Sequence, residues 1–359
     1  MNHIRYSKIS NFKKFKSIEF KDIGMFNLII GDNGIGKTSV LESFLVEKNN
    51  LKATYSNLVA ALWQRLKLRA EVFSKTNILT EFYLNDVKNN QIEIIRTFAE
   101  NNDTSKSSIF IKDVEDFDKE EQKFLVKNIQ YRVINSVIIQ KVEGKLVEMF
   151  PLDIFNTDQN DEIGYNPFIP FHVGYGDDLV EYYSKFIQNN REINNSFIKS
   201  LSFIISKIES IAVSSDKDKG SEIVIWLKEL EKPIPLGMLG EGSARLFRIL
   251  AEIIVCRNKI LLIDEIDTGI HYSRFENFMS VILKTAKLYN VQIFATTHSI
   301  ECLKYLTKAI EESNDEYLIH ESRIFSLIQS DKGEVVPIVY RFPEFKYSIE
   351  NELEIRGGN

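Results

Sequence analysis

The sequence of 359 residues predicts an α/β fold with a mixed, largely parallel central sheet, and three observations predict it. Gly31–Thr38 reads GDNGIGKT and fits the phosphate-loop pattern GxxxxGK[ST] between a strand and a helix. Lys259–Ile263 and Val291–Thr296 are short apolar runs that alternate with helical patterns, as buried parallel strands do. Residues 77–150 change to period-two alternation, which indicates an additional antiparallel meander.

Bulk composition is that of an ordinary globular protein, with 44% hydrophobic and 27% charged residues. The net charge of −6 gives no overall reason to expect nucleic-acid binding. Cys256 and Cys302 lie in different apolar segments without a CxxC pair, which argues against a disulfide framework or a zinc site. The polar, basic start has no apolar signal core, and no apolar run approaches the roughly 20 residues that span a bilayer. We therefore expect a cytoplasmic protein without membrane segments.

Three strands are expected before the phosphate loop: Ile4–Ile9, Ser17–Phe20 and Phe26–Ile30. The turn between the first two carries Lys13, Lys14 and Lys16, a local basic cluster in an acidic protein. These lysines could neutralise a nucleic-acid backbone. They could equally be a solvated hairpin that protects an exposed sheet edge, and the sequence leaves both open.

The phosphate loop has the flanks that its chemistry requires. The buried strand Phe26–Ile30 precedes it, and Ser39–Leu45 has helical spacing, so the loop opens onto a helix N-terminus that favours phosphate. Lys37 would reach the β- and γ-phosphates, and the Thr38 hydroxyl would bind Mg²⁺. The nucleotide-binding residues predicted in this loop are Asn33, Gly34, Gly36, Lys37, Thr38 and Ser39.

The middle of the chain predicts a helix, a meander and a helical segment. Residues 51–75 have an apolar helical face, formed by Leu58, Leu62, Trp63, Leu66 and Val72. The meander strands are expected at Ile78–Leu84, Gln91–Phe98, Ser108–Ile111 and Tyr131–Ile139. Gly164–Asp178 is expected to be a long loop or a lobe boundary. Residues 178–212 return to helical spacing, with one apolar stripe of Ile193, Phe197, Leu201, Ile204, Ile205, Ile208 and Ile211.

The last third alternates strands and helices, which predicts a parallel sheet covered on both faces. Besides the two apolar runs already described, strands are expected at Glu222–Leu227, Ser322–Gln329 and Glu334–Arg341, and helices at Ser243–Val255, Ser273–Tyr289 and Ile300–Ala309. A short helical tail is expected to end at residues 356–358. We divide the chain into an N-terminal lobe (1–170), a helical insertion without a long coiled coil (171–221) and a C-terminal lobe (222–359).

Acidic residues follow the first of the two late apolar runs. In LLIDEID, Asp264 would lie at the carboxyl end of a central strand, where α/β sheets bind ligands, and could hold Mg²⁺. Glu265 could then polarise a water for in-line attack on a γ-phosphate. A solvated loop start is the alternative interpretation of two adjacent acids. His298, in ATTHS after the next strand, could hydrogen-bond the γ-phosphate or the attacking water.

In this order and spacing, GDNGIGKT, LLIDEID and ATTHS resemble the ABC-type ATPases of the RecF and SMC class. The opening ISNFKKFKSIEF also looks like the first strands of that class. The likeness covers nearly the whole chain and is strongest to the OLD-like ATPases, often filed as AAA-type domains 15 and 21. It implies an ABC-type ATPase head that binds ATP and Mg²⁺. It further implies a head-to-tail dimer with two sandwiched nucleotides, each contacted by the phosphate loop of one subunit and the signature loop of the other.

By position, the signature loop is Leu239–Arg245. It departs from the usual LSGGQ, because Gly240 stands where serine is expected and Glu241 replaces a glycine, as in the GDG or GEG loops of OLD-like members. Gly242 and Ser243 are expected to offer free N–H groups and an N-cap at a helix start, which makes an anion site. Gly240, Gly242 and Ser243 are thus the nucleotide-binding residues predicted in this loop.

Three charged residues near these motifs remain to be interpreted. Asp267 would lie in the dimer-facing loop of such an ATPase. Arg245 and Arg248 could add positive charge to the signature loop or pair with nearby acids, Glu241 and Glu252. The class also uses a glutamine near Mg²⁺. Gln140 ends an apolar run and His172 lies in the boundary loop, and neither is assigned that role.

The resemblance is to a stand-alone ATPase subunit. Zinc-hook cysteines and a long arm, found in other members of the class, are absent from the sequence, and it does not continue into the nuclease module of full OLD proteins. Such subunits act beside a separate effector, a nuclease or toxin, in anti-phage systems such as PARIS, Septu and some retrons. Our leading hypothesis is therefore a Mg²⁺-dependent ATPase, a homodimer or higher homo-oligomer, whose nucleotide state controls an effector. The alternatives are an ATP-locked scaffold with little turnover, and a RecF-like DNA-binding repair ATPase that uses the basic hairpin.

Overall fold

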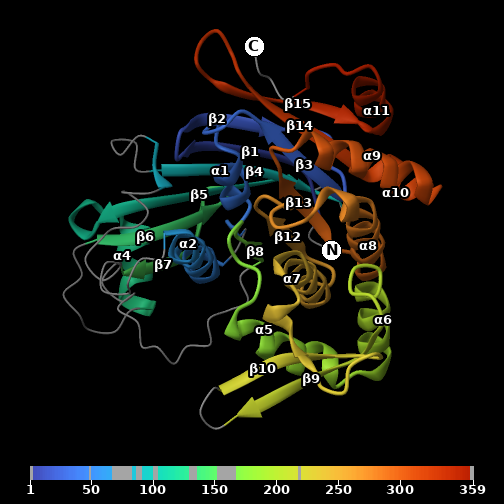
Figure 1. Ribbon diagram of the computed structural model, residues 1–359. Helices are drawn as coiled ribbons and strands as arrows, with labels where there is room; N and C mark the ends of the chain where they lie inside the picture. Colours follow the sequence, from blue (N-terminus) through green and yellow to red (C-terminus); the bar gives the residue numbers. More distant parts are fainter. Residues whose placement is uncertain are drawn as a thin grey trace. The chain divides into compact units, whose positions relative to one another are not determined.

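The computed structural model describes residues 3–47, 50–66, 83–85, 91–99, 104–128, 136–151, 167–216 and 220–355. The chain forms two compact units, and each is assembled from separate stretches of sequence. The first contains Met1–Ile23, Gly31–Phe168 and Leu327–Val339. The second contains Gly24–Ile30, Ile169–Ser326 and Tyr340–Asn359. Figure 1 shows the elements of both units.

The first unit is built on a six-stranded sheet in the order β2-β1-β4-β5-β6-β7. Its strands are β1 (Ile4–Phe12), β2 (Phe15–Phe20), β4 (Gln91–Phe98), β5 (Thr104–Asp113), β6 (Ser136–Val142) and β7 (Lys145–Pro151). Every neighbouring pair is antiparallel, which confirms the predicted meander. Val137, Ile139 and Met149 form a buried cluster with Phe117 on one part of this sheet.

Two of the predicted meander strands differ from the structure in extent. Most of the predicted strand Ile78–Leu84 lies outside the described residues. Leu84, which is described, forms an isolated antiparallel bridge to Phe12. The predicted strand Tyr131–Ile139 is found as β6, and its first part, 131–135, is also outside them. Strand β7 was not predicted, because its charged residues Lys145 and Glu148 interrupt the apolar alternation.

The helices of the first unit are short except for α2. They are α1 (Lys37–Ser43), α2 (Leu51–Leu66), the 3₁₀ turn η2 (Val114–Asp116) and α4 (Lys119–Asn128). The helix predicted at 51–75 is confirmed to Leu66, and its remainder lies outside the described residues. Helix α1 follows the glycine loop directly, as the motif predicts, and ends with a turn at Phe44.

The second unit contains the parallel strands of a six-stranded sheet in the order β15-β14-β3-β13-β12-β8. The strands are β3 (Phe26–Gly31), β8 (Phe168–Ile169), β12 (Ile260–Ile263), β13 (Gln292–Thr296), β14 (Ser322–Gln329) and β15 (Val335–Arg341). Strand β13 pairs in parallel with β12 on one side and β3 on the other. Its residues are all buried, which explains the continuous apolar runs in the sequence.

Two fully buried amides fix the start of β3 against β13. The Asn27 side chain donates from Nδ2 to the carbonyl oxygens of Gly24 and Ile293, at 2.9 and 3.1 Å. Gln292 Nε2 donates to the same Gly24 carbonyl at 2.7 Å. Because buried polar groups need partners, these bonds specify one register for the two strands. The carboxyl ends of β3, β13 and β12 therefore meet at one edge of the sheet.

Besides a small sheet, helices make up the rest of the second unit. They are α5 (Asp177–Tyr182), α6 (Arg191–Leu201), α7 (Glu241–Val255), α8 (Phe275–Tyr289), α9 (Ile300–Ser313), α10 (Glu316–Glu321) and α11 (Phe342–Glu350), with a π-helical turn η4 (Tyr183–Gln188) and 3₁₀ turns η5 (Leu236–Met238) and η6 (Tyr272–Arg274). Helices α8 and α9 pack side by side (Figure 1). Among the described helices, none is both long and apolar enough to cross a bilayer.

Two predicted elements are wrong. The helical tail expected to end at residues 356–358 ends at Glu350 as α11, residues 351–355 are not helical, and 356–358 lie outside the described residues. The helical stripe was extended to Ile208 and Ile211, but these residues belong to strand β9 (Ile208–Asp216). Strand β9 pairs with β10 (Gly220–Leu227), and β11 (Ile234–Pro235) completes a three-stranded sheet. The spacing of three residues between the two isoleucines fits a helix, yet pairing with β10 decides the outcome. The segment 171–221 is therefore helical only to Leu201.

Candidate functional site

The phosphate loop wraps around the start of α1 in the first unit. Gly34 and Gly36 have φ angles of 72° and 108°, in the left-handed region that favours glycine. Lys37 is buried, and its Nζ donates to the carbonyl oxygens of Gly31 and Asp32 at 2.8 and 2.9 Å. The ammonium group is thus held inside the loop at the N-terminus of a helix, the place where an anion is favoured.

The β1–β2 hairpin packs against this loop and its helix. Lys14 Nζ donates to the carbonyl oxygen of Gly34 at 2.7 Å. A side chain at Gly36 would place its Cβ 2.7 Å from the Phe15 ring, so only glycine fits there. Lys13 forms an ion pair with Glu42, which is fully buried on α1. Two of the three hairpin lysines are therefore bonded to the phosphate loop or its helix, and Lys16 is exposed.

The acidic edge lies in the second unit, at the end of β12. The peptide N–H of Asp264 donates to the Ile169 carbonyl oxygen at 2.8 Å, and its carboxylate Oδ1 accepts from Thr296 Oγ1 at 2.7 Å. Glu265 has a φ of 47°, a left-handed conformation that is uncommon outside glycine. The same Thr296 hydroxyl accepts the Glu265 N–H at 2.8 Å. One buried threonine on β13 therefore positions both acids.

The residues after β13 complete this edge. His298 Nε2 lies 3.2 Å from Glu265 Oε1, and both side chains are more than a third exposed. Thr297 Oγ1 donates to Asp267 Oδ1 at 2.6 Å. Burial raises the pKa of Asp267 above its ordinary value, and the Thr297 hydrogen bond offsets part of that rise. Asp264, Glu265, Asp267 and His298, predicted separately from two strand ends, thus lie at one site.

The predicted signature loop differs from expectation in its cap. Helix α7 begins at Glu241, and Gly240, with φ 89° and ψ 154°, is its N-cap. Ser243 lies inside the first turn and is buried, and its N–H donates to the Gly240 carbonyl oxygen at 3.1 Å. Ser243 is therefore not the N-cap, because the helix starts two residues earlier than the apolar pattern indicated.

The signature loop contacts the loop that follows the acidic residues. A Cβ on Gly242 would lie 2.8 Å from the Gly269 carbonyl oxygen. A Cβ on Gly269, whose φ is 77°, would lie 2.8 Å from Glu241 Cγ. The two loops are therefore interlocked: Gly242 packs against the Gly269 backbone, and Gly269 packs against the Glu241 side chain. The sequence predicted the loops but not this contact.

The two arginines of α7 have different partners. Arg248 binds both carboxylate oxygens of Asp178, at 2.9 and 2.7 Å, and pairs with Glu252 at 3.1 Å, as one predicted alternative held. Arg245 is 1% exposed and binds backbone carbonyls instead of Glu241. Both guanidinium groups are buried, so neither adds an exposed positive charge to the signature loop, which was the other predicted alternative.

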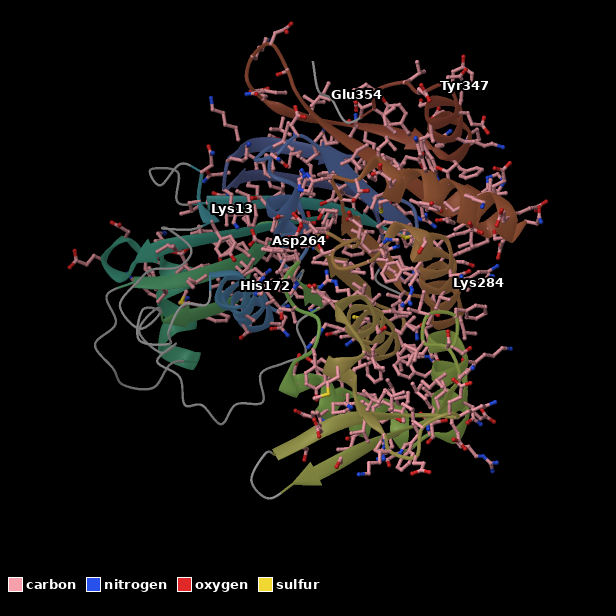
Figure 2. The ribbon with its side chains drawn as sticks, in the orientation of Figure 1. Lys13, His172, Asp264, Lys284, Tyr347 and Glu354 are labelled. Carbon is pink, nitrogen blue, oxygen red and sulfur yellow. The ribbon has the colours of Figure 1, made fainter. Side chains whose placement is uncertain are left out.

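Gln140 and His172, neither of which was assigned as the residue near Mg²⁺, lie in different units. Gln140 is buried in β6, where its Nε2 donates to the Glu47 carbonyl oxygen at 2.8 Å, so it holds the chain beyond α1. His172 follows β8, the strand beside β12 in the sheet order, and Figure 2 labels it together with Asp264. Its ring packs edge-on against Phe171. Within the segment after β8, Pro170 is tied through Arg245 to the Asp264 carbonyl.

Sequence comparisons identify relatives of this chain. Residues 160–303 match the family described as "AAA domain, putative AbiEii toxin, Type IV TA system". A Helicobacter pylori protein named "ATP/GTP phosphatase" is 26% identical over 99% of this chain and 100% of its own length. An uncharacterised protein of Methanocaldococcus jannaschii is 36% identical over 88 residues, which are 24% of this chain and 75% of that protein. Over that stretch, this chain belongs to the same family as the archaeal protein.

Solved structures identify the fold. An SMC head bound to the C-terminal winged-helix domain of ScpA superposes with a TM-score of 0.52 at 10% identity, covering 94% of this chain and 98% of that chain. An SMC head domain with an extended coiled coil, bound to the C-terminal domain of ScpA derived from Pyrococcus furiosus, gives 0.51 at 11% identity, covering 98% and 100%. The fold is that of an SMC-head-like α/β P-loop ATPase.

Proposed function

We propose that the protein is a Mg²⁺-dependent ATPase that hydrolyses ATP to ADP and phosphate. The observation that carries the proposal is the shared edge of β3, β13 and β12. The chain enters the glycine loop from β3, Glu265 follows β12, and His298 follows β13. Ligands of α/β sheets bind at the carboxyl ends of the strands. The full-length Helicobacter pylori relative named as an ATP/GTP phosphatase supports the same activity.

Each residue set would have a distinct role. Asn33, Gly34, Gly36, Lys37, Thr38 and Ser39 would bind the phosphates of the nucleotide. Glu265 would take the proton of the attacking water, and His298, 3.2 Å from its carboxylate, would orient that water or contact the γ-phosphate. Because Thr296 anchors the Glu265 N–H, the carboxylate starts from a fixed backbone position.

Mg²⁺ fits the available oxygen donors. It prefers one or two carboxylates together with phosphate oxygens and water, rather than a cage of protein ligands. Asp264 and the Thr38 hydroxyl would supply the protein ligands, and the Thr296 bond to Oδ1 fixes the orientation of the Asp264 carboxylate. Among the described residues, no group of three or more His, Cys, Asp and Glu could hold a metal by itself. The metal, when bound, would neutralise charge on the phosphates.

A second copy of the chain would complete the nucleotide site. Gly240, Gly242 and Ser243 of one copy would face the nucleotide held by the phosphate loop of the other, and Asp267 would lie at the contact. Support comes from the start of α7, where Gly240 is exposed and Gly242 is half-buried at a helix N-terminus, although Ser243 is buried. ATP would therefore drive a homodimer or a higher homo-oligomer.

Glu265→Gln tests the catalytic assignment. It keeps the size of the side chain and removes the base, so we expect ATP turnover to fall by about 100-fold or more while ATP affinity is retained. Phosphate release and binding of a fluorescent ATP analogue are measured on the same samples, with EDTA as the metal-free arm. Glu276→Gln, the same change at an α8 surface carboxylate paired with Lys308, is the matched control and should leave turnover unchanged. Equal turnover in Glu265→Gln and the control would refute the assignment.

We further propose that ATP-driven assembly controls a separate effector, a nuclease or toxin, in anti-phage defence. Support comes from the resemblance of the motifs to OLD-like subunits and from the toxin-system description of the matching family. The test expresses this chain and its neighbouring gene together and counts phage plaques. Protection that is lost in Lys37→Ala supports the proposal, and equal plaque counts with and without the pair refute it.

Nucleic acid remains a second candidate partner, because Lys14 and Lys16 are exposed on the β1–β2 hairpin. The Lys13 ion pair and the Lys14 bond to Gly34 reduce the charge that this hairpin can offer. Fluorescence anisotropy with duplex DNA at low salt tests this candidate. Equal affinity of the wild type and a Lys14→Ala/Lys16→Ala variant would remove it.

A further inference from the structure

Arg245 connects three segments of the second unit that the sequence places far apart. Its Nη1 donates to the carbonyl oxygens of Pro170 and Val173, at 2.7 and 2.6 Å. Its Nη2 donates to the Asp264 carbonyl oxygen at 2.8 Å and approaches that of Glu265 at 3.5 Å. The guanidinium group therefore links α7, the segment after β8 and the backbone of both acids.

The environment of Arg245 makes these bonds strong. The side chain is 1% exposed, so water does not compete for the donors. Burial lowers the pKa of Arg245 to about 10, with a smaller contribution from nearby Arg248, and the group still stays cationic at neutral pH. Hydrogen bonds from a charged group are stronger than those between neutral groups. The planar fork of arginine fits paired carbonyl oxygens in a way that lysine cannot reproduce.

The backbone at Glu265 needs such support. Its φ of 47° is a left-handed conformation, which costs energy for a residue with a side chain. The Glu265 N–H is held by Thr296, and the Asp264 N–H is held by Ile169. Arg245 holds the carbonyl side of the same two residues. By contrast, the Glu265 side chain is 36% exposed, and its hydrogen-bond distances within the described part of the chain are longer, 3.3 Å to Thr268 Oγ1 and 3.2 Å to His298 Nε2. Its carboxylate is thus placed mainly by its backbone.

The position of Arg245 on α7 ties this support to the signature loop. It stands in the first turns of the helix that begins after Gly240, two residues beyond Ser243. Gly242 in the same turn is interlocked with Gly269, four residues beyond Glu265. A displacement at the helix start would therefore move both the guanidinium group and the loop after the acids.

We propose that Arg245 is a positioning residue that holds Glu265 in place for catalysis and makes this placement depend on the signature loop at the start of α7. The proposal rests on the proposed ATPase function. It explains why a fully buried cation on α7 binds the backbone of the acidic edge, whereas its neighbour Arg248 does not.

Arg245→Lys is the test, and Arg248→Lys is its matched control. Arg248 is equally buried on the same helix and binds Asp178, Glu252 and the Gly174 carbonyl, but neither acid of the edge. We expect Arg245→Lys to lower kcat by about 10-fold or more, with the KM for ATP and ATP-dependent association little changed. Arg248→Lys should stay within about twofold of the wild type in kcat. A merely structural role would change both variants alike.

A double variant separates positioning from general damage. In the Glu265→Gln background, Arg245→Lys should not lower the residual rate further, because the base that it positions is already gone. If the double variant is slower than Glu265→Gln by the same factor by which Arg245→Lys slows the wild type, the proposal is overturned. A folded Arg245→Lys variant with normal kcat would also overturn it. If Arg245→Lys does not fold, Arg245→Gln, which keeps two N–H donors, replaces it. Failure of both to fold while Arg248→Lys folds would assign Arg245 to stability alone and overturn the proposal. Failure of the proposed ATPase function would be recognised separately, because the wild type itself would then not hydrolyse ATP.

Discussion

Lys37 shows at the scale of one residue how the phosphate loop is prepared for its ligand. Its ammonium group is buried and bonded to two carbonyl oxygens of its own loop. A phosphate would therefore have to replace these two bonds to neutral carbonyl oxygens with bonds to charged oxygens, in which both partners are ionised. The pattern GxxxxGK[ST] predicted this residue because the loop chemistry depends on local sequence alone.

Asp267 gives a prediction for pH dependence. Burial raises its pKa above the ordinary 3.8, so the folded protein holds this proton more tightly than the unfolded chain. The stability that this group contributes is therefore complete at pH values below 3.8, and it is lost as the pH rises through the raised pKa. We expect the free energy of unfolding of Asp267→Asn to increase relative to that of the wild type as the pH rises above 3.8. Urea denaturation across this range measures it, and a constant difference would contradict the prediction.

Residues that act through tertiary contacts could not be predicted. Thr296 in ATTHS and Arg245 at the end of the signature loop organise the acidic edge, yet neither motif indicated that role. Ser243 was predicted as a cap from its residue type, but Gly240 is the N-cap of the helix. The bonds that decide these roles join residues 19 to 75 positions apart, so they depend on the folded arrangement.

At the scale of elements, the β1–β2 hairpin is fastened to α1 by the buried pair of Lys13 and Glu42. Lys13→Met would remove the ammonium group that faces the buried Glu42 carboxylate, so we expect a loss of about 3–5 kcal/mol in the free energy of unfolding. A Lys13→Met/Glu42→Leu double variant should recover much of that loss, because both charges are removed.

Lys16→Met is the matched control for this prediction. Lys16 belongs to the same hairpin and is exposed, so its replacement should change the stability by no more than about 0.5 kcal/mol. Chemical denaturation of the full chain measures all four proteins. Strictly additive losses in the double variant would show that the ion pair does not fasten the hairpin.

Strands with continuous apolar runs were predictable, and strands with mixed composition were not. The runs at β3, β12 and β13 indicated buried parallel strands because both faces of these strands are covered. Strand β7 contains Lys145 and Glu148, and β9 follows a helical stripe without a break in spacing. For β7 and β9, pairing with a neighbouring strand outweighs the local pattern.

At the scale of the whole molecule, each of the two units is built from three stretches that are separated in the sequence. Gly24–Ile30 contributes β3 to the second unit, and the phosphate loop that follows belongs to the first. The order of motifs therefore predicted the fold class, which the SMC head structures confirm. How the chain is divided between the units could not be predicted, because it depends on contacts between distant segments.

Mixing two inactive variants is the most direct test of the central claim, that each nucleotide is bound by the phosphate loop of one copy and the signature loop of another. Lys37→Ala disables the first half-site, and Gly240→Asp, at the exposed N-cap of α7, places a like charge against phosphate in the second. In a two-fold dimer, an equal mixture forms mixed dimers with one intact site, so ATP turnover should return to about a quarter of the wild-type rate. A mixture as inactive as its separate components, although mixed dimers form, would contradict the account.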